Sequence, residues 1–97
     1  MAVLQIVRFR AKPDVTDEEM VAINDRFQRE VAPTLPGLER REATCSDDGD
    51  WLLVLRYADM DHAAGGAARD TSPVATEFMS MIDMTSMSAS FHPVVSE

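Results

Sequence analysis

The seven residues Trp51-Leu-Leu-Val-Leu-Arg-Tyr57 constrain the fold more than any other segment. Side chains in a β-strand alternate between two faces, so Trp51 and Tyr57 share one face while Leu52 and Val54 lie on the other. A strand that is apolar on both faces must be covered on both sides. A chain of 97 residues supplies helices for one face but little for a second layer. We therefore expect a partner subunit, a second copy of the chain, on the uncovered face.

Composition indicates one globular domain, residues 1–97, because 45% of the residues are hydrophobic. There are 17 acidic and 9 basic residues, a formal net charge of -8. This balance argues against nucleic acid or an anionic membrane as a partner, since both require clustered Lys and Arg. The chain has no apolar run of about 20 residues and no basic leader before an apolar segment. We expect a cytoplasmic protein.

Local signals in the first half predict two strands around a helix and a third strand after a tight turn. Residues 2–10 alternate as a strand does. Thr16-Asp-Glu-Glu19 is a capping box that starts a helix, which Pro33 and Pro36-Gly37 end. Residues 38–46 are more polar and predict an edge strand. The turn at 47–50 then joins this strand to 51–57 as a hairpin.

The second half predicts two helices and a last strand. Asp59 caps a short helix that Gly65-Gly66 weaken, and Ser72-Pro73 start a second helix with Val74, Phe78 and Ile82 on one face. Residues 84–95 read as a strand with Met87, Ala89 and Phe91 on one face, and Ser86, Ser88, Ser90 and His92 on the other. The order is βαββαβ, which predicts an α+β, ferredoxin-like fold with an antiparallel four-stranded sheet.

The chain resembles the dimeric α+β barrel superfamily over nearly its whole length, and within it the antibiotic biosynthesis monooxygenase-like domains. The resemblance rests on Val3–Phe9, Pro36-Gly37-Leu38, Trp51–Tyr57 followed by Asp61-His-Ala63, Pro73–Phe78 and Phe91-His-Pro-Val94. It implies a homodimer whose two sheets pair as a barrel, with a pocket between each sheet and its own helices. These are features of architecture rather than a catalytic fingerprint.

The same resemblance implies a function. Some relatives bind a small apolar or aromatic ligand, such as a polyketide, and oxygenate it without metal or other cofactor. By resemblance, Trp51 and Tyr57 orient the substrate, and His92 or Gln5 moves a proton or holds an oxyanion. The remaining candidate pocket residues are apolar: Phe78, Met79, Met87 and Phe91. Methionine suits this place because it lines adaptable pockets, although it also fills cores.

Departures from the family pattern limit this reading. In the oxygenase branch an Asn that precedes the Trp takes part, whereas the turn here offers only Asp47, Asp48 and Asp50, whose anionic side chains would repel an oxyanion. Haem-degrading relatives need an axial His where this chain has the Ala- and Gly-rich run 63–68, and His62 lies too early. We read His62 as part of a solvated helix cap and Cys45 as a small buried hydrophobe. No histidine has partners at metal-ligand spacing, so we expect no metal site.

Two alternatives to the oxygenase remain open. One is a non-catalytic dimeric barrel, a ligand sensor or a structural protein, whose pocket is filled by its own methionines. The other is a cyclase or isomerase on the same scaffold, which requires that His92 and Tyr57 meet. A cavity that accepts an aromatic ring, with Tyr57 and one proton acceptor converging on it, favours the oxygenase, and a filled interior favours the structural protein.

Overall fold

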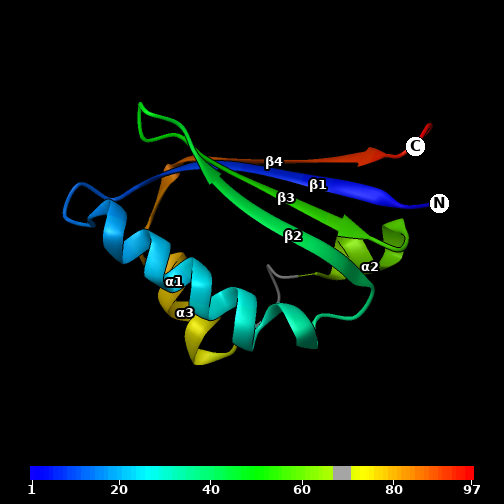
Figure 1. Ribbon diagram of the computed structural model, residues 1–97, viewed down its shortest axis with the longest axis horizontal. Helices are drawn as coiled ribbons and strands as arrows, with labels where there is room; N and C mark the ends of the chain where they lie inside the picture. Colours follow the sequence, from blue (N-terminus) through cyan, green and yellow to red (C-terminus); the bar gives the residue numbers. More distant parts are fainter. Residues whose placement is uncertain (67–70) are drawn as a thin grey trace.

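The computed structural model describes residues 1–66 and 71–97 and has two layers, a four-stranded sheet and the helices on one face of it (Figure 1). The sheet order is β2-β3-β1-β4, with every neighbouring pair antiparallel. In chain order the elements are β1 (Val3–Ala11), α1 (Asp17–Glu30), a 3-10 turn η1 (Ala32–Thr34), β2 (Leu38–Cys45), β3 (Trp51–Tyr57), α2 (Met60–Gly65), α3 (Pro73–Ser80) and β4 (Ile82–Pro93). This confirms the predicted ferredoxin-like α+β arrangement, with β2 as an edge strand.

Strand β3 alternates as its sequence predicted. Trp51, Leu53, Leu55 and Tyr57 are buried beneath the helices, whereas the side chains between them are partly exposed. The neighbouring strand β1 continues both faces, because Val7 pairs with Leu53. The helix-facing side of the sheet is therefore the core side, and the opposite side has no cover within the described part of this chain (Figure 1).

Helix α1 starts at the predicted capping box. The Thr16 hydroxyl accepts from the Glu19 N–H at 3.1 Å, and the Glu19 carboxylate accepts from the Thr16 N–H at 3.0 Å. These hydrogen bonds hold the pKa of Glu19 below its usual value, so the box persists on acidification until the pH falls through that lowered pKa. The helix packs Met20, Ile23 and Phe27 onto the sheet.

The later caps are also confirmed. The Asp59 carboxylate accepts from the His62 N–H at 2.9 Å and starts α2, and the Ser72 hydroxyl accepts from the Ala75 N–H at 3.3 Å and starts α3. The turn between β2 and β3 uses Gly49 at φ +84°, where a side chain would be strained. His62 is partly exposed and sits on its capping carboxylate, as predicted.

Two local predictions are wrong. Ile82 does not belong to the second helix: α3 ends at Ser80, and Ile82 is the first residue of β4, paired with Ala11. The Lys12 N–H donates to the Met81 carbonyl at 2.9 Å. The chain therefore pairs with β1 from this point, and the helix ends. Cys45 is exposed rather than buried, because it lies at the end of the edge strand β2.

No helix within residues 1–66 and 71–97 is long and apolar enough to cross a membrane. The cytoplasmic location stays a prediction.

Candidate functional site

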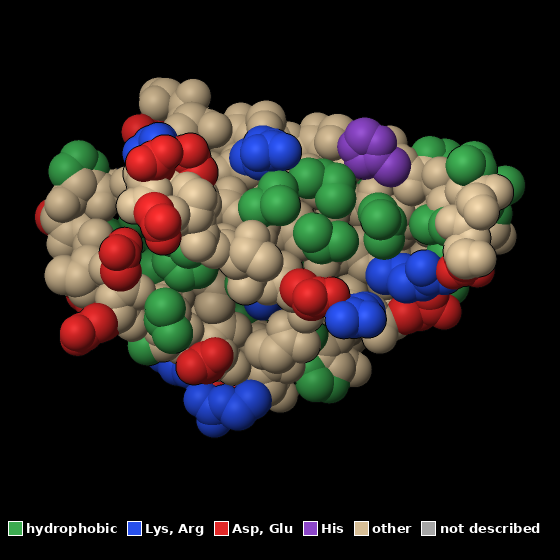
Figure 2. Space-filling model, turned by 45° about the horizontal axis from the view of Figure 1, so that its top comes forward, with side chains coloured by type: hydrophobic (Ala, Val, Ile, Leu, Met, Phe, Trp, Pro, Cys, Tyr) green, Lys and Arg blue, Asp and Glu red, His purple; other side chains and the backbone are tan. Residues whose placement is uncertain are grey.

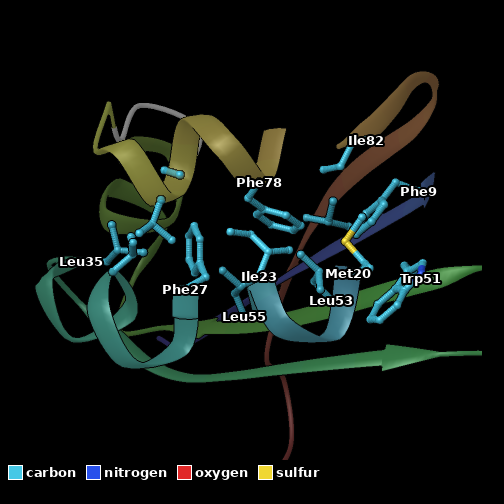
Figure 3. Packing of buried hydrophobic residues seen from close by; sticks show 14 of the residues in the cluster. Phe9, Met20, Ile23, Phe27, Leu35, Trp51, Leu53, Leu55, Phe78 and Ile82 are labelled. Carbon is cyan, nitrogen blue, oxygen red and sulfur yellow. The ribbon is translucent and has the colours of Figure 1, made fainter. Parts of the chain in front are cut away.

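A cavity of about 300 Å³ lies between the middle of the sheet and the helices α1 and α3. This volume is at the lower end of the range for small-molecule sites in proteins. Its lining is almost entirely apolar and comes from all four strands and both helices or their flanks: Gln5, Val7, Phe27, Arg41, Leu53, Leu55, Ala75, Phe78, Met79, Met84, Met87 and Ala89. Figure 3 shows Phe27, Phe78, Leu53 and Leu55 directed into the space between the layers. Met79 and Met84 are partly exposed, which leaves the cavity open to solvent on that side.

Arg41 supplies the charge at this cavity. It stands on β2 opposite Leu55, and only 6% of its surface is exposed. One guanidinium nitrogen donates to the Asn24 amide oxygen at 2.8 Å, and the other terminal nitrogen donates to the Gln28 amide oxygen at 3.3 Å. The guanidinium carbon lies 4.5 Å from the centre of the Phe27 ring, within cation–π range.

The positive charge of Arg41 has no counter-ion among the described residues, where every ion pair involves other groups. Burial lowers the pKa of its guanidinium to about 10, and the charge interaction with Tyr57 opposes that shift. The group therefore still carries its proton at neutral pH. A cation buried without a counter-ion is costly, so the arrangement favours a ligand that brings negative charge.

Sequence reasoning missed Arg41 because a β-bulge decides which way it points. Leu38 pairs with Tyr57 and Arg40 with Arg56, so Glu39 is an extra residue in β2. Without this bulge, alternation from Leu38 would place Arg41 on the outer face. Counting back from Ala43, which pairs with Leu53, places Arg41 on the inner face, and this pairing is known only from the structure.

Four of the predicted pocket residues, Gln5, Phe78, Met79 and Met87, line the cavity together. Phe91 pairs with Gln5 and shares its face of the sheet, but it is 41% exposed and is not among the described residues that line the cavity. A role for any of them in substrate binding stays a prediction.

Trp51 and Tyr57 lie at opposite ends of β3, and neither is among the described residues that line the cavity. The Trp51 indole stacks on Phe9, with ring centroids 6.2 Å apart and an angle of 7° between the planes. The Tyr57 side chain is fully buried, and its hydroxyl packs so closely on Gly66 that any Cβ at that glycine would overlap it. Both aromatics close the ends of the core around the cavity.

His92 does not meet Tyr57 within one chain. It pairs with Leu4, on the outer face of the sheet, whereas Tyr57 pairs with Val3, on the helix face. Its Nε2 atom lies 2.7 Å from the Ser90 hydroxyl. The sheet separates the two side chains, so the His–Tyr pair that a cyclase or isomerase would need is not formed inside this chain.

The outer face of the sheet carries an apolar patch, made of Leu4, Ile6, Leu52 and Val54, which are all partly exposed. Figure 2 shows this face, with hydrophobic side chains at its middle and charged side chains and a histidine around them. Among the charged side chains, Arg56 pairs with Glu39 at 3.2 Å, and Arg40 with Glu42 at 2.7 Å.

No group of three or more His, Cys, Asp or Glu side chains within residues 1–66 and 71–97 has the arrangement of a metal site.

Comparison with known proteins shows similarity in structure alone. No family model matches the sequence, and no curated protein matches it. SnoaB, a cofactor-independent oxygenase from Streptomyces nogalater, superposes with a TM-score of 0.77 at 15% identity over 99% of this chain and 95% of SnoaB. A monooxygenase from the gene ActVA-Orf6 of Streptomyces coelicolor, solved with the ligand nanaomycin D, gives 0.72 at 17% identity over 99% and 90%.

A third structure is a dimeric protein of unknown function with a ferredoxin-like fold, from Bacteroides fragilis. It gives a TM-score of 0.66 at 19% identity over 96% of each chain. These likenesses, with the strand order and the covering helices, show that the chain has the ferredoxin-like α+β fold of the antibiotic biosynthesis monooxygenase-like proteins.

Proposed function

We propose that this protein binds an aromatic or polyketide-like molecule in the cavity and oxygenates it with dioxygen, without a cofactor. The observation that carries the proposal is the cavity itself, a space of about 300 Å³ that apolar and flexible side chains leave open in the middle of the core. Two polar side chains belong to this lining, Gln5 on β1 and Arg41 on β2, and both residues pair with Leu55 of the strand between them. Similarity in fold to SnoaB, a cofactor-independent oxygenase, supports the reaction class.

The chemistry needs an acidic C–H bond beside an electron-rich carbonyl or phenol. Loss of that proton gives an enolate, whose negative oxygen Arg41 and the Gln5 amide would stabilise. The carbanion form reduces dioxygen by forming a C–O bond, and protonation of the product gives a hydroperoxide. Loss of water then leaves a carbonyl, so that CH₂ and O₂ become C=O and H₂O. A carbon centre is oxidised, and dioxygen is the electron acceptor.

The lining has no carboxylate or imidazole among the described residues. In this proposal the substrate proton therefore passes to water at the open side of the cavity, and the protein promotes ionisation by stabilising the anion. This differs from the sequence-derived hypothesis that His92 acts as the base, because His92 lies across the sheet.

Oxygen uptake by the metal-free protein, offered anthrones and hydroquinones, tests the proposal. Ala89 lines the cavity from β4, so Ala89→Trp should fill it and lower saturable uptake about tenfold or more, the scale of a lost transition-state contact. Ala64→Trp, on the exposed side of α2, should keep the wild-type rate. Tyr57→Phe should also keep it, because the hydroxyl packs on Gly66.

Loss of uptake in Tyr57→Phe with full uptake in Ala89→Trp would overturn the assignment to this cavity. Binding of the aromatic compounds without uptake across the panel would favour the second candidate, a non-catalytic ligand-binding barrel. The same cavity supports that candidate, since binding requires only the space and its lining.

We further propose that the protein is a homodimer joined through the outer face of the sheet. The apolar patch of that face lacks cover in the described chain, and a protein of similar fold is dimeric. Sedimentation equilibrium should show a dimer for the wild type and a monomer for Val54→Glu. The same substitution at Val21, 50% exposed on α1, should leave the dimer intact, and a monomeric wild type would contradict the proposal.

A further inference from the structure

Arg41 is paired differently from the other arginines that make polar contacts in the described chain. Arg10, Arg26, Arg40 and Arg56 are more exposed, and each lies within salt-bridge distance of a carboxylate. The buried Arg41 instead contacts two neutral amides. The protein has 17 acidic residues, so a carboxylate at this place would have been an ordinary solution. The guanidinium thus lines an apolar cavity, and no carboxylate among residues 1–66 and 71–97 pairs with it.

We infer that the cavity selects aromatic ligands carrying a delocalised oxygen anion, a carboxylate or an ionised enol, and that Arg41 binds that anion. This inference rests on the proposed function, because it names the class of ligand for the same cavity. The inference also goes beyond the proposed function, because an oxygenase of this type could act on wholly neutral substrates.

The surroundings of Arg41 hold its guanidinium ready for such a group. A guanidinium has five N–H donors, and the described amides accept from two of its nitrogens. Asn24 is itself fixed, since its amide nitrogen donates to the Met20 carbonyl at 2.9 Å and its oxygen is thereby turned to Arg41. The Phe27 ring supports one face of the guanidinium. A planar oxygen anion matches the fork geometry of guanidinium donors, so binding through the donors that these amides leave over would add direction to the charge interaction.

A purely structural role for Arg41 is the competing explanation. Its contacts with Phe27 and Asn24 tie β2 to α1, and this alone would justify an arginine. Such a role predicts that substitutions change stability and leave the preference for ligand charge unaltered. Equilibrium binding of matched charged and neutral ligands separates the two explanations and needs no catalytic turnover.

The experiment is isothermal titration calorimetry at neutral pH and low salt. One pair of probes is 2-naphthoate and 2-naphthamide, and the other is ionised 2-hydroxy-1,4-naphthoquinone and its neutral methyl ether. We expect the wild type to prefer the anion in at least one pair by about tenfold or more, and the pair with the larger ratio identifies carboxylate or enolate. Arg41→Met should abolish that preference. Arg40→Met, one residue away on the outer face, should retain it.

Asn24→Asp is the second variant, in case Arg41→Met does not fold. It keeps the shape of the side chain and places a carboxylate 2.8 Å from the guanidinium, which supplies the missing counter-ion internally. The affinity for the anions should fall about tenfold, while the affinity for the neutral partners stays within about twofold. Circular dichroism verifies that each variant is folded.

Equal affinity for anion and neutral partner, no measurable binding of either anion, or a preference that survives both variants would overturn the inference. These results are independent of oxygen uptake. Turnover of a neutral anthrone without any charge preference would leave the proposed function standing and remove the inference. Charge-selective binding without turnover would support the inference and count against the proposed oxygenase function.

Discussion

The two ends of β3 and its middle use the same helix-facing side of one strand in different ways. At the ends, Trp51 stacks on Phe9 and Tyr57 is buried against Gly66, so aromatic rings fill the space. In the middle, Leu53 and Leu55 border the cavity. Rigid rings packed on neighbours exclude a ligand, whereas short and flexible side chains leave room for one. The aromatic residues at the ends therefore belong to the packed core and are not among the described residues that line the cavity.

This comparison separates stability from binding along one strand. The packed ends include Met20 and Ile82, which are also fully buried. Figure 3 shows Met20 beside Phe9 and Trp51, on the side of the core away from Phe27. The middle lies beside Arg41, whose guanidinium donates to the Asn24 amide oxygen and pairs with no carboxylate in the part of the chain that the structure describes. We expect substitutions at the ends to change the free energy of unfolding, and substitutions in the middle to change affinity for a ligand.

The largest effect is expected at the Trp51 end. Trp51→Ala removes a large ring that is only 4% exposed, and should lower the free energy of unfolding by about 3–5 kcal/mol. Met79→Ala, at the solvent side of the cavity and 37% exposed, should cost less than about 1 kcal/mol. Urea denaturation followed by circular dichroism measures both. An equal loss of unfolding free energy in the two variants would contradict the distinction between a packed end and an open middle of the strand.

A smaller effect is expected at the Tyr57 end. A Cβ on Gly66 would overlap the Tyr57 hydroxyl, so Gly66→Ala should destabilise the protein by about 1–3 kcal/mol, as overpacking does. Gly65→Ala is the matched control, because nothing lies within 4 Å of a Cβ there. Combining Gly66→Ala with Tyr57→Phe should recover part of the loss. If Gly66→Ala lowers the free energy of unfolding no more than Gly65→Ala does, the Tyr57 end is less tightly packed than its contacts indicate.

The elements themselves could be predicted because their signals are local. The capping box at Thr16–Glu19, the turn at Gly49 and the caps at Asp59 and Ser72 each need only three or four neighbouring residues. Ile82 shows where such signals fail. Ile82 does have helical spacing from Phe78. However, the hydrogen bond from the Lys12 N–H to the carbonyl of Met81, the residue before Ile82, already joins the chain to the sheet.

The candidate site could be predicted only in part. Gln5, Phe78, Met79 and Met87 were expected at a pocket and line the cavity, since strand parity and helix spacing already orient them. The alternation of side chains in β4 also placed His92 on the opposite face from Met87 and Phe91. It did not show which of these two faces meets the helices and Tyr57. Pairing of His92 with Leu4 and of Tyr57 with Val3 decided that.

The order of the strands and helices and the two faces of β3 follow from the residue pattern alone, because they depend on periods of two and 3.6 residues along the chain. The helix caps follow from it as well, because each needs only a few neighbouring residues. Which aromatic side chains fill space and which border the cavity became known from the three-dimensional packing, because that depends on neighbours distant in sequence. The tertiary structure also decided the place of Arg41. One extra residue at Glu39, accommodated by pairing with β3, turns the guanidinium from the outer face into the cavity.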